Sequence, residues 1–120
     1  MKIYFKTKKL EKICNKEKES VKAVGEKNAR RLQQRMMELK AAGNLSDVST
    51  LPPARCHELS GNRKRQFSVD INKNYRLLFI SANEPTPEKD GGGLDKNRIT
   101  AIEIIYDSKW RLVLILQSCS

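Results

Sequence analysis

Residues 55–79 read RCHELSGNRKRQFSVDINKNYRLLF, and this stretch decides the fold. Between residues 67 and 71 apolar and polar side chains alternate, which is the two-residue period of a strand with one buried face. Residues 72–74 (Asn-Lys-Asn) form a turn signal, and residues 75–80 predict a second strand, apolar on both faces. Because residues 60–62 (Ser-Gly-Asn) offer an earlier turn, we expect three antiparallel strands in a meander.

The first third of the chain predicts one short strand and two helices. Residues 2–5 are strand formers, and the charged residues after them start a helix whose buried side would hold Leu10 and Ile13. A long amphipathic helix is expected over residues 20–42, ending at Gly43. Its apolar stripe consists of Val21, Val24, Leu32, Met36 and Leu39, and its polar side of Lys22, Lys27, Arg30, Arg31 and Arg35.

The remaining segments complete a single domain over residues 1–120. Residues 46–53 are a linker that ends in two prolines, and residues 82–97, with two Pro and three Gly, are expected to be a long flexible loop. Residues 99–106 return to strand. The expected fold class is therefore α+β, with the N-terminal strand and two helices packed on one face of a mostly antiparallel sheet. Residues 110–120 form an atypical tail that either adds an edge strand or has no specified structure.

Positive charge is concentrated in the first two-thirds of the chain. The formal net charge is +10, with 13 Lys and Arg against 5 acids in residues 1–40, 6 against 2 in residues 55–76, and 5 against 6 in residues 84–120. Such a surface favours nucleic acid as the partner, ahead of an acidic protein and of a membrane surface. The basic side of residues 20–42 is either a solvated surface or a contact for nucleic acid.

The cysteines give no sign of a disulfide framework or a metal site. Cys14, Cys56 and Cys119 are far apart, odd in number and not accompanied by histidines at zinc-ligand spacing. The first ten residues lack the apolar core of a secretory signal, and the longest apolar run, residues 112–116, is too short to span a membrane. We therefore expect a cytoplasmic protein without a metal, cofactor or membrane partner.

The motif pattern resembles one family. The residues that carry the resemblance are His57-x-Leu59-x-Gly61, Arg63, Phe67-Ser68 and Tyr75-Arg76-Leu77-x-Phe79. They are similar to the HigB-like toxins of type II toxin-antitoxin systems, in the RelE/ParE superfamily, over about residues 51–105. The resemblance implies a RelE-like fold and a ribosome-dependent mRNA endonuclease. It also implies a HigA-like antitoxin with a helix-turn-helix domain, through which alone the toxin would meet operator DNA.

The implied reaction is a metal-independent transesterification of RNA. The ribose 2′-OH attacks the adjacent phosphorus, which requires a base, an acid and cations that stabilise the phosphorane. We expect Arg76 to stabilise the phosphorane, and the alternative is a structural ion pair of Arg76 with Asp70 or Glu103. Because free histidine side chains exchange a proton near neutral pH, His57 suits either proton transfer, although a lone histidine is often a satisfied core residue.

Further cations would bind the substrate. Arg63 and Lys64 at the hairpin tip are expected to hold backbone phosphates, with Arg65 and Lys73 as accessory groups. The alternative is a solvated turn. Tyr75 would be a stacking platform for a base or part of the core.

The C-terminus departs from the family pattern, in which the last strand commonly ends in Asp-Tyr-His. Here residues 105–109 read IYDSK, so Asp107 and Lys109 are the candidates that would replace the missing catalytic histidine. This departure leaves two alternatives to a nuclease. One is a non-catalytic, gyrase-binding toxin of the ParE type, and the other is an inactive homologue that only binds its antitoxin.

Overall fold

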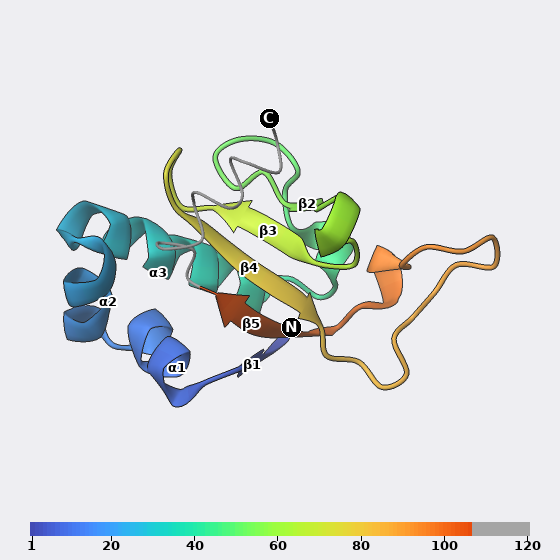
Figure 1. The fold of residues 1–120 in the computed structure, drawn as a ribbon, viewed down its shortest axis with the longest axis horizontal. Helices are drawn as coiled ribbons and strands as arrows, with labels where there is room; N and C mark the ends of the chain where they lie inside the picture. Colours follow the sequence, from blue (N-terminus) through green and yellow to red (C-terminus); the bar gives the residue numbers. More distant parts are fainter. Residues whose placement is uncertain (107–120) are drawn as a thin grey trace.

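A five-stranded sheet organises the part of the chain that the computed structural model describes, residues 1–106 (Figure 1). Asp107, Lys109 and the tail 110–120 lie outside the described residues, so the predictions made for them remain predictions. The strands are β1 (Lys2–Phe5), β2 (His57–Glu58), β3 (Phe67–Asp70), β4 (Arg76–Ser81) and β5 (Ala101–Tyr106). The helices are α1 (Lys8–Asn15), α2 (Glu17–Val24) and α3 (Glu26–Ala41), with short 3₁₀ turns η1 (Leu45–Asp47), η2 (Gly61–Arg63) and η3 (Lys96–Arg98).

The sheet order is β1-β5-β4-β3-β2. Strands β2, β3, β4 and β5 pair antiparallel in that sequence, whereas β1 pairs parallel to β5. The predicted meander and the predicted fold class are therefore confirmed. Between Leu78 and Phe79 the β4–β5 register shifts, because Ile105 is an extra residue opposite β4.

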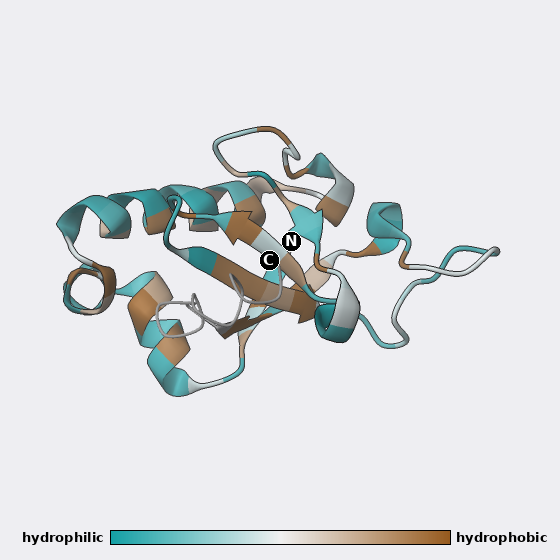
Figure 2. Ribbon diagram, turned by 45° about the horizontal axis from the view of Figure 1, so that its top comes forward, coloured by the Kyte–Doolittle hydropathy of each residue, from teal (hydrophilic) through white to brown (hydrophobic). Residues whose placement is uncertain are grey.

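The helices and the apolar core lie on one face of the sheet. In the view of Figure 1, α3 passes behind β3 and β4. Alternation along the strands directs one set of side chains toward the helices: Phe67, Val69, Leu77, Phe79, Ile102 and Ile104. The rings of Phe67 and Phe79 stack with their centroids 5.8 Å apart. Figure 2 shows hydrophobic residues concentrated in these strands and mainly hydrophilic ones along α3.

The opposite face of the sheet, called here the outer face, carries the alternate residues. Among them are Ser68, Asp70, Arg76 and Glu103. A small apolar cluster on this face contains Leu78 and Ile105, with Leu59 and Ile80 packed against it. No helix of residues 1–106 covers this face, although Ser68 and Asp70 are buried in it.

The single helix predicted for residues 20–42 is wrong, because the chain turns a corner at Gly25. This residue has φ +88° and ψ 163°, a conformation that is essentially restricted to glycine. Its N–H completes α2 by donating to the Val21 oxygen (2.9 Å), and its C=O begins α3 by accepting from the Ala29 N–H (2.8 Å). Consequently Val21, predicted to be buried, lies on the surface with 37% of its area exposed.

The corner is tied to α3 by side chains. The Ser20 hydroxyl donates to the Ile13 carbonyl, which joins α2 to α1. Gln33 of α3 donates from Nε2 to the Cys14 carbonyl (3.0 Å) and to the Ser20 Oγ (3.2 Å). The three helices therefore form one connected layer. None of the helices in residues 1–106 is long and apolar enough to cross a membrane.

The loop predicted between β4 and β5 is present, and it contains local backbone pairing. It projects from the sheet in Figure 1, and its two arms pair through a bridge between Glu88 and Leu94. The Lys89 N–H donates to the Gly93 oxygen (2.9 Å), and the Leu94 side chain is buried. The glycines thus lie at the tip of this loop.

Replacing Gly25 by alanine tests the helix break. A Cβ at this position would meet no atom within 4 Å, so the expected cost is backbone strain alone, about 1–3 kcal/mol of the free energy of unfolding. A continuous helix would instead be stabilised by up to about 1 kcal/mol. Urea denaturation of Gly25→Ala therefore distinguishes a helix break from a continuous helix by the sign of the change in the free energy of unfolding.

Gly91→Ala is the matched control for this substitution. Gly91 also has open space around its Cβ position, but its φ lies outside the left-handed region. We expect a change within about 0.5 kcal/mol. Equal effects of the two substitutions would contradict the assigned corner.

Cys56 belongs to the core and is not a reactive thiol. Burial raises the pKa of its thiol to about 11, against a smaller lowering by Lys96. At about pH 8 only about 0.1% of such a thiol is ionised, against about a quarter of an ordinary one. We expect iodoacetamide to leave Cys56 unmodified in the native protein and to modify it in concentrated urea, as peptide mass mapping would show. Rapid labelling of the native protein would contradict this placement.

Candidate functional site

Three arginines from separate parts of the chain meet at Asp70, the last residue of β3. Arg35 of α3 donates from Nε to the Asp70 carbonyl oxygen (2.8 Å). Arg55, which precedes β2, places Nη1 3.3 Å from the carboxylate Oδ2, and Arg76 of β4 places Nε 3.6 Å from Oδ1. These four residues are called the Asp70 cluster below.

The Asp70 cluster keeps a net positive charge although its carboxylate is buried. The Asp70 side chain is 12% exposed, and it serves two guanidinium groups at once. Arg35 also forms an ion pair with Glu38 (Nη1 to Oε2, 3.1 Å). Within residues 1–106, three cations therefore face two carboxylates. Because solvent screening is weak around buried groups, the excess charge acts over a longer range than on the open surface.

The sheet register and one strained loop bring the cluster together. Asp70 and Arg76 are directly opposite each other in the β3–β4 ladder, and both point to the outer face. Arg55 reaches them from a backbone with φ +48°, a left-handed conformation that is uncommon outside glycine. The loop of Arg55 is anchored to β3 by the Asp70 N–H, which donates to the Ala54 oxygen (2.7 Å).

His57 lies on the same face as the cluster. It pairs with Ser68 across β2 and β3, and it follows Cys56, whose side chain points into the core. The ring Nδ1 is 2.8 Å from the Arg55 carbonyl oxygen. Because a carbonyl oxygen only accepts, this contact requires the proton on Nδ1, and it leaves Nε2 of the neutral ring as a base.

Ser68 is a residue that sequence reasoning did not single out beyond the family pattern. Its side chain is fully buried, and its hydroxyl has no hydrogen-bond partner within residues 1–106. It lies opposite His57 in the ladder and two residues before Asp70. A buried hydroxyl without a hydrogen-bond partner costs free energy of folding. The Ser68 hydroxyl is thus a buried polar group beside His57 on the outer face.

The predicted hairpin-tip cations form a separate group at the start of β3. Arg63 donates from Nη1 to the Gln66 Oε1 (3.2 Å). Arg65, at φ +74°, donates its backbone N–H to the Glu58 carboxylate (3.0 Å), and its Nη1 is 3.6 Å from the Glu88 Oε2. Lys64 is exposed. The Arg63 side chain therefore holds the turn η2 to Gln66, whereas the Arg65 side chain reaches the β4–β5 loop.

The two other residues predicted to bind substrate lie at the far end of β3. Lys73 is exposed in the β3–β4 turn, and Tyr75 is half-buried with its ring packed against the main core. Since a four-residue strand is about 13 Å long, Lys73 is well separated from Arg63 and Lys64. The structure thus brings Arg76 and His57 to one face, and it divides the other predicted cations between two ends.

Arg35, Arg55 and Asp70 are missing from the sequence-based site. The placement of Arg35 on the solvated side of the long helix is wrong, because only 4% of this residue is exposed. Its spacing offered a signal: Arg35 lies three residues after Leu32 and four before Leu39, on the edge of the buried stripe. The position of Arg55 depends on a loop conformation that the hydrophobic periodicity of the sequence does not predict.

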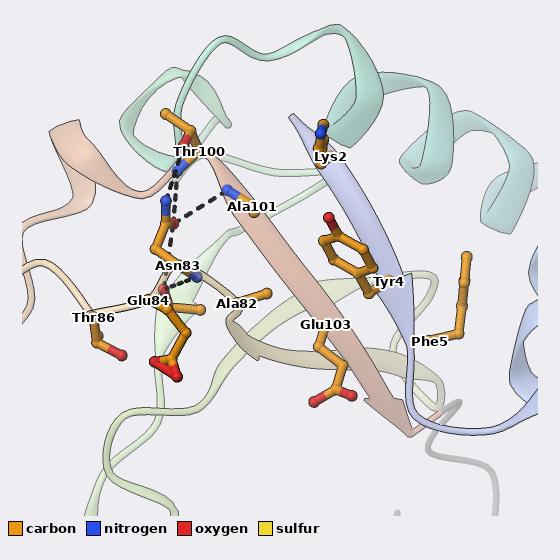
Figure 3. A pocket seen from close by; sticks show the side chains of 11 residues that line it. Lys2, Tyr4, Phe5, Ala82, Asn83, Glu84, Thr86, Thr100, Ala101 and Glu103 are labelled. Carbon is orange, nitrogen blue, oxygen red and sulfur yellow. Dashed lines mark hydrogen bonds between the residues drawn. The ribbon is translucent and has the colours of Figure 1, made fainter.

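Another hollow lies near β1, and its charged lining is mainly acidic, in contrast to the Asp70 cluster. It has a volume of about 940 Å³ and lies between β1 and the segment that leaves β4 (Figure 3). Asn83 forms one wall, with its Oδ1 accepting from the Thr100 and Ala101 N–H groups (3.0 and 3.2 Å). Glu84 and Glu103 outnumber Lys2 among its lining side chains, so this hollow does not suit a phosphate.

Within residues 1–106 no three His, Cys, Asp or Glu side chains are grouped as metal ligands would be. The arrangement that can do chemistry is therefore the Asp70 cluster together with His57. It offers a base and two guanidinium groups for a phosphodiester, and the acid that cleavage also requires is not among these residues.

Comparisons with known proteins agree with the fold and identify the family. The family model described as "RelE-like toxin of type II toxin-antitoxin system HigB" matches residues 3–87, well over half of the chain. A YoeB/ParE toxin from Agrobacterium tumefaciens is similar in structure, with a TM-score of 0.51, 11% sequence identity, and coverage of 88% of this chain and 93% of that one. A YoeB-YefM complex from Staphylococcus aureus gives a TM-score of 0.48 at 15% identity, covering 88% and 91%.

A search of curated proteins found no match. At these identities the structural likeness concerns the fold alone. The family match, however, includes His57, Arg63 and Arg76, the residues on which the sequence resemblance depends, and extends it to the helices. The chain belongs to the HigB-like toxins, which are RelE-like toxins of type II toxin-antitoxin systems.

Proposed function

We propose that this toxin is a ribosome-dependent endoribonuclease that cuts mRNA during translation. The observation that supports the proposal best is the position of the Asp70 cluster, which holds Arg55 and Arg76 within 3.3 and 3.6 Å of one carboxylate, on the sheet face that also carries His57. Family membership supports the same reaction class. The toxin would act in the bacterial cytoplasm, on mRNA in the ribosome.

The reaction proceeds by attack within the RNA strand. The Nε2 of His57 accepts the proton of a ribose 2′-OH, and the oxygen forms a bond to the adjacent phosphorus. The bond from phosphorus to the 5′ oxygen of the next nucleotide breaks, and that oxygen gains a proton. The products are a 2′,3′-cyclic phosphate and a free 5′-OH. Asp107 and Lys109 remain the proposed donors of this second proton.

Arg76 is proposed to stabilise the phosphorane, and its ion pair with Asp70 is compatible with that role. A guanidinium is planar and presents several N–H donors, so one edge can face a carboxylate while another faces a phosphate. Asp70 then fixes the orientation of Arg76 before the substrate arrives, which reduces the reorganisation needed in the transition state. Arg55 shares the carboxylate and contributes a second positive charge.

The basic surface also fits the proposed partners. A HigA-like antitoxin with an acidic segment would neutralise the cations of residues 1–76, and only this antitoxin would contact operator DNA. Arg63, Lys64, Arg65 and Lys73 are proposed to bind phosphates of mRNA or ribosomal RNA, and Tyr75 to support the turn that carries Lys73. These contacts predict an association that weakens steeply with salt.

Removing the Arg76 side chain should abolish most of the cleavage. In a cell-free translation reaction with primer-extension mapping, we expect Arg76→Ala to lower the cleavage rate by about 10²- to 10³-fold, the usual effect of losing one donor to a transition-state anion. Arg76→Lys keeps the charge but not the fork, and it should retain an intermediate rate.

Arg30→Ala is the matched control, because Arg30 is exposed on α3 and pairs only with Glu26 at 3.8 Å within the described residues. It should cleave like the wild type. Wild-type rates for Arg76→Ala would overturn the assigned role. Intact mRNA with the wild-type protein would overturn the proposed reaction, and a gyrase supercoiling assay would then test the ParE-type alternative.

Asp70→Asn should affect both stability and cleavage. The amide has no charge and only one acceptor oxygen for the two guanidinium groups, so we expect the free energy of unfolding to fall by about 2–4 kcal/mol. As a positioning residue, Asp70 should influence kcat more than KM. Asp95→Asn changes the same group at the exposed pair of Asp95 with Arg98 (2.9 Å) and should cost less than about 1 kcal/mol. Equal costs for the two variants would contradict the central place of Asp70.

A further inference from the structure

We infer that a hollow between α3 and the β3–β4 turn is a second binding site for a phosphodiester of RNA, distinct from the position of the proposed cleavage. This inference rests on the proposed function, since it assigns RNA as the ligand. The hollow has a volume of about 630 Å³. Its cationic lining comes from three segments of the chain: Arg31 and Arg35 of α3, Arg55, and Lys73 of the turn.

The charge balance of this hollow suits an anion. Four cationic side chains line it against one carboxylate, that of Asp70, which already serves Arg55 and Arg76. Within residues 1–106 neither Arg31 nor Lys73 takes part in an ion pair shorter than 4.0 Å. The two exposed cations at the rim therefore keep their charge available for a ligand, whereas the buried Arg35 is paired with Glu38 at 3.1 Å.

The rim of the hollow is held in place before any ligand binds. Asn72 accepts the Asn74 and Tyr75 N–H groups on its Oδ1 (2.6 and 2.8 Å), which closes the turn around Lys73. The Nδ2 of Asn72 donates to the Oδ1 of Asn28 on α3 (2.5 Å), so the turn and the helix are joined directly. The backbone that carries Lys73 and Arg31 is thus already ordered on either side of the opening. Binding a ligand would therefore cost little backbone conformational entropy.

The hollow and the proposed cleavage site share the Asp70 cluster. Arg55 lines the hollow and binds the same carboxylate as Arg76, so a single strand of RNA can contact Arg76 on the outer face and the hollow a short way along its backbone. An acidic protein segment is the competing ligand. The lining favours RNA, because its apolar members are only Pro52, Pro53 and the buried Ile71, which offer no pocket for the aromatic or aliphatic anchors of a protein interface.

The test measures binding of a single-stranded, 2′-O-methylated RNA oligonucleotide that cannot be cleaved, by fluorescence anisotropy over a range of salt concentrations. Arg31→Ala and Lys73→Ala should each weaken binding for all sequences and reduce the slope of log K against log salt by about 0.7, the value for one phosphate contact on a single strand. Arg30→Ala, one residue along α3 and outside the lining of the hollow, should leave the slope unchanged.

Slopes for Arg31→Ala and Lys73→Ala equal to that of Arg30→Ala would overturn the inference. So would a loss of affinity for a hexaglutamate peptide with RNA binding unchanged, which would assign the hollow to an acidic protein. The outcome is separable from the cleavage assay because the oligonucleotide has no free 2′-OH. A protein that binds through the hollow but never cuts mRNA would refute the proposed reaction and support this site, and the reverse result would refute this site alone.

Discussion

The carboxylate of Asp70 holds Arg55 and Arg76, and the carbonyl oxygen of the same residue holds Arg35. This contact fastens the helix α3, the loop before β2 and the strand β4 to the end of β3. A buried carboxylate that loses its partners is strongly destabilising, so all three segments are constrained by one residue. The cost of burying this charge is offset by its ion pairs with Arg55 and Arg76.

The two faces of the sheet therefore differ in role: one buries apolar side chains, and the other carries the polar side chains of the candidate site. The helix-covered face supplies apolar burial through residues such as Phe67, Val69 and Phe79, which is enough to define the register of β3 and β4. Once that register is set, it also fixes the positions of the alternate residues, which lie on the outer face. Asp70 falls opposite Arg76, and Ser68 opposite His57. The polar arrangement is thus a consequence of the apolar one.

The sequence allowed the strands to be predicted well, because a two-residue period and turn signals are local. It did not reveal the helix corner, because Gly25 is tolerated inside a helix at moderate cost and only its actual backbone angles show a break. For the site, the motif pattern indicated His57 and Arg76, which share a face. Charge density alone could not separate Arg63 and Lys64 from Lys73, since it ignores which end of β3 each occupies. The position of the Arg55 side chain depends on the left-handed backbone of Arg55 itself, a conformation set by tertiary contacts and not by a local sequence pattern.

The net charge of +10 is a poor guide to where RNA would bind, because the structure distributes the carboxylates unevenly. Arg30, Arg65 and Arg98 each have an acidic partner on the exposed surface, so their effect on a distant anion is largely cancelled. Around the Asp70 cluster, by contrast, cations outnumber the carboxylates that face them, and part of that charge is buried. Screening by salt is weakest there. For the proposed RNA binding, the quantity that matters is the local excess of guanidinium over carboxylate, and in residues 1–106 it lies between α3 and the β3–β4 turn.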